Sequence, residues 1–306
     1  MTPAPDVLVI GATGSLGGAT LAALRERGRG ARVLVRRRRP DLVHPLTEQV
    51  VGDLGDAASV RAALVGIRAA FYVSPHEEAE LAYARRFVEE AERAGVRVVF
   101  AGVHATRRTL AGRLEGAVVR RIMPHYRGKL AIGALIEREA TDAVLLTPTA
   151  FFQNDELFLE DIAAGVYPAP LKGFSMVSTA DVGAVAARAL LEPGFPPGTH
   201  RVVGPRSMTG AEVAAAWSRA LGRPVRHTGD DAAAWARTAD LRLAAGRKGE
   251  DYRGSFAGLG RHRLTASAKD VARTAALLGR PPQDYADWAA EVVAAGRVPV
   301  TAPTPA

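Results

Sequence analysis

Glycines at positions 11, 14 and 17 form a pattern near the start of the chain that can bind a phosphate group. They follow a short apolar run, residues 7–10, and precede a stretch with helical periodicity. Glycine lets the chain turn sharply off a strand, lets backbone N–H groups approach a pyrophosphate and lets the helix pack closely on the strand. The positive end of that helix then faces the phosphates. We therefore expect a dinucleotide to bind this loop through Gly11, Thr13, Gly14, Ser15, Leu16 and Gly17.

Four consecutive arginines, residues 36–39, follow the second apolar run. NAD-specific sites usually carry an acidic residue at this place, which binds the ribose 2′-hydroxyl and repels a phosphate. A guanidinium instead pairs with phosphate through two hydrogen bonds. We expect Arg36 and Arg37 to bind the 2′-phosphate, so that NADP(H) is favoured over NAD(H), and the other two arginines to face solvent. Further cofactor contacts are expected after the third and fourth strands, from Asp53, Leu54, Ser74 and Pro75.

With these motifs the chain resembles the NmrA-like branch of the atypical short-chain dehydrogenases over about residues 6–225. The resemblance rests on the loop 11–17, on Lys129, on a Pro-x-x-Phe-Phe-x-Asn pattern within residues 147–154, and on residues 35–36, 52–53, 99–100 and 177–181. It implies a Rossmann domain with a small C-terminal substrate lobe. Members of this branch include NAD(P)H-dependent quinone, isoflavone and phenylcoumaran-type reductases, and also cofactor-binding sensors without known turnover.

The catalytic residues of typical short-chain dehydrogenases are a Tyr-x-x-x-Lys pair and a serine after the fifth strand. The matching positions here hold His125, Lys129 and Gly102, with Tyr126 one residue beyond the tyrosine position. The resemblance implies that Lys129 binds the cofactor ribose. The proton donor stays open: His125 has a side chain whose ordinary pKa suits proton donation at neutral pH, Tyr126 could rotate in instead, or neither acts and the site only binds.

Substrate contacts are expected from one loop and from the stretch after the sixth strand. His104 follows the fifth strand, at the carboxyl edge of the sheet, where ligands bind in open α/β sheets; a loop histidine without contact to a substrate is the alternative. The resemblance implies that Phe151, Phe152, Asn154 and Tyr167 line the substrate pocket. An apolar wall with aromatic groups favours a flat, weakly charged molecule such as a quinone or an enone.

The elements that position these residues alternate between strand and helix. Strands are predicted at residues 7–10, 32–36, 49–53, 69–73, 96–101 and 143–147, and helices between them, at residues 56–64, 77–94 and 126–139 among others. Such alternation implies a parallel sheet with helices on both faces and right-handed crossovers. The fold class is therefore α/β, a doubly wound parallel Rossmann sheet with a smaller α+β C-terminal substrate lobe.

The second half of the chain is less regular. We expect a dinucleotide-binding domain over residues 1–150, a smaller substrate lobe over residues 151–296 that is interleaved with it, and a frayed tail over residues 297–306. Within the lobe, helices are predicted from Thr179 to Leu190 and over residues 231–248 and 267–278. Thr209 and Glu212 form a capping box that should begin a further helix. Short strands are predicted at residues 200–203 and 225–227.

Composition limits the possible partners and sites. The chain has 306 residues, no cysteine and a formal charge of +8, so disulfides and thiolate metal sites are excluded. The arginines are spread along the chain without a nucleic-acid-binding motif, no apolar run approaches the length of a membrane span, and no group of side chains has metal-ligand spacing. We expect a cytoplasmic monomer or homodimer that acts on a small molecule and binds neither nucleic acid, membrane nor metal.

These residues favour an NAD(P)H-dependent oxidoreductase that reduces a small conjugated or aromatic carbonyl compound. Two other functions stay open. The absent serine and tyrosine would suit a redox sensor or regulatory protein that binds the cofactor without turnover. The fold would also serve a non-redox isomerase or cyclase of a biosynthetic pathway.

Overall fold

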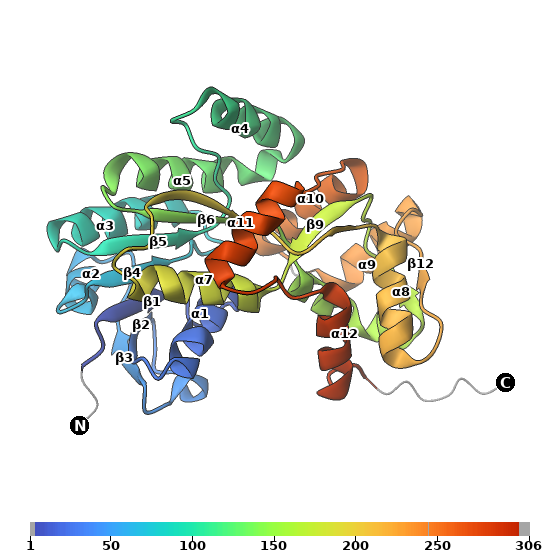
Figure 1. The fold of residues 1–306 in the computed structure, drawn as a ribbon, viewed down its shortest axis with the longest axis horizontal. Helices are drawn as coiled ribbons and strands as arrows, with labels where there is room; N and C mark the ends of the chain where they lie inside the picture. Colours follow the sequence, from blue (N-terminus) through green and yellow to red (C-terminus); the bar gives the residue numbers. More distant parts are fainter. Residues whose placement is uncertain (1–3, 244, 300–306) are drawn as a thin grey trace. The chain divides into compact units, whose positions relative to one another are not determined.

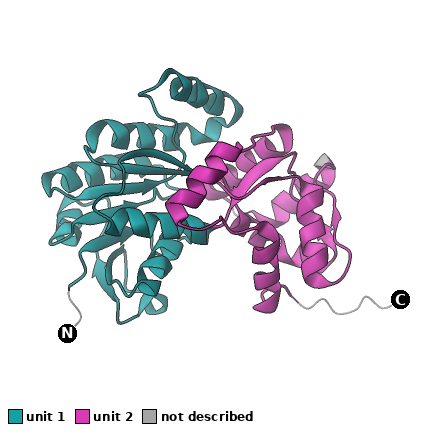
Figure 2. Ribbon diagram, in the orientation of Figure 1, with its two compact units in different colours: residues 1–148, 179–202 teal, residues 149–178, 203–306 magenta. Residues whose placement is uncertain are grey.

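The computed structural model describes residues 4–243 and 245–299. The chain divides into two compact units, which Figure 2 shows in separate colours. Unit 1 comprises Met1–Pro148 and Thr179–Val202, and unit 2 comprises Thr149–Ser178 and Val203–Ala306. The first boundary lies close to residue 150, but residues 179–202, which we expected in the second lobe, belong to unit 1.

Unit 1 is built on a seven-stranded sheet of order β10-β6-β5-β4-β1-β2-β3, in which every pair of neighbours is parallel. The doubly wound fold class is thereby confirmed. The sequence predicted six strands for this sheet, one too few. The seventh is β10, which pairs with β6 although residues 149–178 of unit 2 lie between the two strands in the sequence. The strands are β1 (Val7–Ile10), β2 (Ala31–Val35), β3 (Thr47–Val51), β4 (Ala69–Tyr72), β5 (Arg97–Ala101), β6 (Val144–Pro148) and β10 (Gly198–Val202).

Helices cover both faces of this sheet, as Figure 1 shows. On one face, α2 (Ala57–Leu64), α3 (Glu80–Arg93) and α5 (Arg127–Glu139) share a hydrophobic core with the strands. On the other face lie α1 (Ser15–Glu26) and α7 (Thr179–Leu191). These two helices approach closely because α7 has a glycine at the contact: a Cβ atom on Gly183 would lie 2.5 Å from the carbonyl carbon of Ala19.

Helix α4 (Leu110–Ile122), between β5 and α5, was not predicted. Figure 1 shows it on the outer side of α5. Its apolar side chains Leu110, Leu114 and Val118 are exposed, whereas its buried positions are Gly112 and Gly116. The hydrophobic period of this helix therefore does not mark its packed face, which is why the sequence pattern gave no sign of it. Two short 3₁₀ helices complete unit 1, η1 (Pro40–Leu42) and η2 (Pro124–Tyr126).

Unit 2 combines two small sheets with several helices around an aromatic core that includes Phe152, Trp217, Tyr285 and Trp288. Its strands are β7 (Ala150–Phe151), β8 (Val166–Tyr167), β9 (Phe174–Val177), β11 (Ser207–Met208) and β12 (Arg226–His227). Its helices are η3 (Phe152–Phe158), α6 (Leu159–Ala163), α8 (Gly210–Leu221), α9 (Ala232–Arg242), α10 (Arg247–Arg261), α11 (Ala268–Leu278) and α12 (Tyr285–Ala294).

The sequence predictions for unit 2 had different outcomes. The capping box of Thr209 and Glu212 is confirmed and begins α8. The single helix predicted over residues 231–248 was wrong, because α9 ends at Arg242 and α10 begins at Arg247. The predicted tail falls largely on residues 300–306, which lie outside the described part of the chain. Within the described residues, no helix combines the length and apolarity needed to cross a membrane.

Candidate cofactor and active site

The loop between β1 and α1 has the backbone that its glycines predict. Gly11 adopts a φ of +76°, and its carbonyl accepts a hydrogen bond of 2.9 Å from the backbone N–H of Gly14. A Cβ atom on Gly17 would lie 2.1 Å from the same carbonyl oxygen, so this position admits only glycine. Among the described residues no side chain caps α1 and no acidic residue lies in its first turn. Its N–H groups can therefore face an anion, beside the exposed residues Thr13 and Ser15.

The other predicted cofactor residues of unit 1 lie at the same edge of the sheet. Strand β1 lies between β2 and β4, so the parallel strands bring their carboxyl ends together. Arg36 and Arg37 follow β2 and are exposed, and the Arg36 guanidinium lies 3.3 Å from the carboxylate of Glu77. Ser74 and Pro75 follow β4 and are half-buried.

The residues after β3 are held by local contacts. The Asp53 side chain is exposed and its carboxylate accepts a hydrogen bond of 2.5 Å from the N–H of Gly55. Leu54 is partly buried against the core beneath α2 and α3. The carboxylate of Asp53 thus has a fixed orientation and remains exposed to solvent, which suits the predicted contact with the cofactor.

Lys129 lies in a buried polar cluster near the carboxyl ends of β4 and β5. Its Nζ atom is 3.2 Å from Oε2 of Glu80, the first residue of α3, and both side chains are buried, with 9% and 2% exposed. Tyr72 ends β4, and its hydroxyl is buried without a hydrogen-bond partner among the described residues. Burial, and secondly the charge of Glu80, raise the pKa of this phenol. Sequence reasoning missed Glu80, although an acidic residue in the first turn of a predicted helix was visible.

The candidate proton donors precede helix α5. His125 and Tyr126 lie in the 3₁₀ helix η2, and their ring centroids are 4.2 Å apart. Helix α5 begins only at Arg127, so the four-residue spacing of His125 and Lys129 does not stack their side chains on one continuous α-helix. Both aromatic residues are half-buried. Their assignment as proton donors stays a prediction.

The serine position after β5 is closed to a side chain. A Cβ atom on Gly102 would lie 2.5 Å from Cζ of Phe100. The Phe100 ring is buried in the sheet core and packs against Tyr72 at a centroid distance of 6.4 Å. The ring of Phe100 therefore occupies the space that a serine at residue 102 would need.

His104 lies deeper than a substrate contact needs. Its side chain is fully buried, and a Cβ atom on Gly133 of α5 would lie 2.6 Å from its Nδ1 atom. Neither ring nitrogen has a hydrogen-bond partner among the described residues, although Nε2 is 3.7 Å from Glu137. Burial lowers the pKa of this imidazole, and Glu137 opposes that effect. These contacts favour a packing role for His104.

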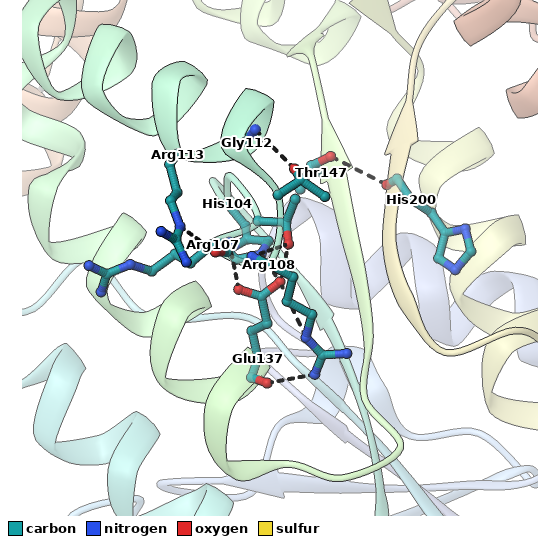
Figure 3. A network of polar contacts seen from close by, with 10 residues as sticks. His104, Arg107, Arg108, Gly112, Arg113, Glu137, Thr147 and His200 are labelled. Carbon is teal, nitrogen blue, oxygen red and sulfur yellow. Dashed lines mark hydrogen bonds and ion pairs between the residues drawn. The ribbon is translucent and has the colours of Figure 1, made fainter.

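Glu137 holds the loop that carries His104, as Figure 3 shows. Its carboxylate accepts hydrogen bonds from the Thr106 hydroxyl and, at 2.8 Å, from the Arg107 N–H. Burial alone would raise the pKa of Glu137, but these hydrogen bonds outweigh it and the pKa is lowered. The Arg108 guanidinium donates to the Glu137 carbonyl at 2.9 Å. The charged carboxylate thus fixes the path of the chain from β5 to α4.

The predicted substrate residues of unit 2 differ in exposure. Phe151 and Asn154 are half-buried, whereas Phe152 and Tyr167 belong to the core of unit 2. The Tyr167 hydroxyl donates a hydrogen bond of 3.0 Å to the fully buried carboxyl group of Asp155. Burial of Phe152 and Tyr167 favours a structural role for both, so substrate contact stays a prediction best suited to Phe151 and Asn154.

Comparison with known proteins identifies the family. A model of the NmrA-like family matches residues 4–231. The chain belongs to this NmrA-like family. The resemblance inferred from the glycine loop and the Pro-x-x-Phe-Phe-x-Asn pattern is thereby confirmed.

Two curated relatives of this NmrA-like protein are named as reductases. It is 32% identical over 295 residues to (4-alkanoyl-5-oxo-2,5-dihydrofuran-3-yl)methyl phosphate reductase of Streptomyces griseus, and the match covers 93% of this chain and 97% of the relative. It is 29% identical over 226 residues to NAD(P)H azoreductase of Xenophilus azovorans, and the match covers 72% of this chain and 76% of the relative.

Solved structures share the fold at lower identity. The NADPH-dependent quinone oxidoreductase of Escherichia coli in complex with NADPH matches with a TM-score of 0.71 and 20% identity, over 94% of this chain and 99% of that one. The triphenylmethane reductase of Citrobacter sp. in complex with NADP(H) matches with a TM-score of 0.73 and 18% identity, over the same shares. At these identities the match describes the fold alone.

Proposed function

We propose that the protein is an NAD(P)H-dependent oxidoreductase that reduces small conjugated or aromatic acceptors such as quinones, enones or azo compounds. The observation that carries the proposal is the shared sheet edge: the uncapped N-terminus of α1 and the arginines after β2 lie at the carboxyl ends of neighbouring strands. The names of the curated relatives, reductases of azo and oxo-dihydrofuran compounds, support the substrate class.

The residues of unit 1 fit a nicotinamide dinucleotide. Gly11 and Gly17 leave room for backbone N–H groups to approach a pyrophosphate, since a Cβ atom at Gly17 would close the loop. Lys129 is proposed to bind the ribose hydroxyls. The bound cofactor supplies the hydride for the reduction. His125 or Tyr126 is proposed to donate the accompanying proton, because these residues stand at and beside the tyrosine position of the Tyr-x-x-x-Lys pair.

The test is a titration with NADPH, NADP, NADH and NAD, followed by turnover with the tightest cofactor on a panel of quinones, enones and azo dyes. We expect cofactor consumption with at least one acceptor class. Lys129→Met should weaken cofactor binding, whereas His125→Gln and Tyr126→Phe should show which side chain donates the proton through a loss in kcat. Tight cofactor binding without consumption across the whole panel would contradict the reductase.

We further propose that NADP(H) is preferred over NAD(H) through Arg36. Arg36→Ala should weaken NADPH binding by roughly 1–3 kcal/mol, the range for a hydrogen bond to a charged group, and leave NADH binding nearly unchanged. Arg38→Ala is the matched control, because it removes an exposed charge from the same run of arginines without a predicted phosphate contact. Calorimetry decides the question, and an equal loss for both cofactors would count against the proposal.

A second candidate function is a cofactor sensor without turnover. The Phe100 ring beside Gly102 and the placement of His125 outside α5 favour it, since both remove parts of the usual proton-transfer machinery. A sensor should distinguish oxidised from reduced cofactor in affinity and should retain a protein partner in a pulldown. Equal affinities together with no partner would rule it out.

A further inference from the structure

The ion pair between Glu80 and Lys129 is buried, which sets it apart from most ion pairs of the chain. Only 2% of the Glu80 side chain and 9% of the Lys129 side chain are exposed, and their charged atoms are 3.2 Å apart. Glu80 begins α3 and Lys129 is the third residue of α5, two neighbouring helices on the same face of the sheet. Two helices therefore meet at this pair.

The positions of the two charges in their helices explain why they pair. A carboxylate at the first residue of a helix is stabilised by the positive end of the helix, which favours Glu80. Helical side chains lean toward the N-terminus, so the ammonium of Lys129 points toward the positive end of α5, which is unfavourable for a cation. A buried ammonium in that place needs an opposite charge, and Glu80 provides it.

The surroundings make the pair sensitive to the loss of one partner. The buried hydroxyl of Tyr72 has no hydrogen-bond partner among the described residues and senses the charge of Glu80. The neighbouring rings of Phe87 and Phe100 stack on Tyr72. Burial strengthens an ion pair but penalises a buried charge that loses its ion-pair partner.

We propose that Glu80 is a positioning residue for Lys129. Its carboxylate fixes the otherwise flexible ammonium at the carboxyl edge of the sheet, in the orientation that binds the ribose hydroxyls of the cofactor. Glu80 acts through Lys129 and not by contact with the substrate. The inference rests on the proposed function, in which Lys129 binds the cofactor.

The test measures the dissociation constants of NADPH and NADH by cofactor fluorescence, together with thermal unfolding. Glu80→Gln should weaken the binding of both cofactors by about tenfold, the size of one lost hydrogen bond to a charged group. It should weaken both alike, because both carry the same nicotinamide ribose. Glu80→Asp keeps the charge on a shorter side chain and should restore part of the affinity.

Two further variants separate positioning from mere stability. Glu90→Gln is the matched control: Glu90 is a buried glutamate of the same helix with 3% exposed, and it pairs with Arg61 and Arg93 instead of Lys129. It should lower the unfolding temperature and leave cofactor affinity unchanged. In a Lys129→Met background, Glu80→Gln should raise the unfolding temperature, because it removes a buried charge that has lost its lysine partner, and should change cofactor affinity by less than about twofold.

The outcomes are distinct. Cofactor affinity that is unchanged in Glu80→Gln, or that falls equally with and without Lys129, overturns the positioning role. A loss of affinity in Glu90→Gln as large as that in Glu80→Gln does so too, because it points to general destabilisation of α3. All these readouts concern cofactor binding, so a protein that binds NADPH but reduces no acceptor would refute the proposed reductase and leave this inference standing.

Discussion

Gly102 shows how one residue can alter the chemistry available to a fold. The resemblance to short-chain dehydrogenases implies a catalytic serine at this place. Here the Phe100 ring, on the same strand end, fills the space where the Cβ atom of a serine would stand. The ring cannot move away easily, because it is buried and packs on Tyr72. The two positions thus depend on each other.

This coupling predicts that the missing serine cannot be restored by a single substitution. Gly102→Ser should destabilise the protein by about 1–3 kcal/mol, the usual cost of overpacking a core, and should not raise kcat. Gly194→Ser is the matched control, since no atom lies within 4 Å of the position of its Cβ atom and its φ is not positive. It should change stability by less than about 0.5 kcal/mol. Chemical denaturation of both variants measures the difference, and a stable Gly102→Ser protein with higher turnover would contradict it.

The residues of the site were predictable from sequence to different degrees. The glycine loop could be identified because each glycine answers a local steric demand, and the close approach of Gly17 to the Gly11 carbonyl shows that demand directly. Glu80 could not be identified, because its importance depends on Lys129, 49 residues away in the sequence. The burial of His104 escaped prediction for a related reason: the space it fills is created by Gly133 on another element.

At the scale of elements, helix α5 organises the polar contacts on its side of the sheet. Lys129, Gly133 and Glu137 are spaced four residues apart and so lie on one face of the helix. The first contacts Glu80 of α3, the second packs against His104, and the third holds the loop after β5. A shift of α5 would therefore move Lys129 and the loop together.

Elements whose packing follows their hydrophobic pattern were predictable, and those that pack by other means were not. Strands β1, β2, β4, β5 and β6 are mostly buried and apolar, and the structure has a strand within one or two residues of each predicted run. Helix α4 packs through Gly112 and Gly116 and exposes its leucines, so its pattern is misleading. Strand β10 was foreseen as a strand, but its place beside β6 depends on the chain returning from unit 2, which no local pattern encodes.

At the scale of the whole molecule, each unit has its own hydrophobic core, and the core of unit 2 contains an ionisable carboxyl group. Asp155 accepts hydrogen bonds from Tyr167 at 3.0 Å and from Tyr285 at 2.5 Å, and Tyr285 in turn accepts one of 2.8 Å from Trp217. Burial raises the pKa of the Asp155 carboxyl from 3.8 to about 7, although the two tyrosine hydrogen bonds oppose it. The folded protein therefore binds this proton more tightly than the unfolded chain.

A raised pKa in the folded state makes unit 2 less stable as the pH rises. Below about pH 4 Asp155 is protonated in both states, between about pH 4 and 7 only the folded state keeps the proton, and above that both states are ionised. Moving the pKa from 3.8 to about 7 corresponds to about 4 kcal/mol. Asp155→Asn removes this dependence, so its stability relative to the wild type should rise by up to that amount between pH 4 and pH 8.

Tryptophan fluorescence can measure the stability of unit 2, because all three tryptophans of the chain belong to it: Trp217, Trp235 and Trp288. Denaturation of the wild type and of Asp155→Asn followed by this signal therefore tests the prediction.

Asp284 supplies a control whose stability should change with pH in the opposite direction. Burial raises its pKa, but hydrogen bonds from the Ala286 N–H and from Arg206 outweigh that effect and lower it. Asp284→Asn should therefore lose stability relative to the wild type as the pH rises through 4. A stability difference for Asp155→Asn that does not vary with pH would show that folding does not raise the pKa of this carboxyl.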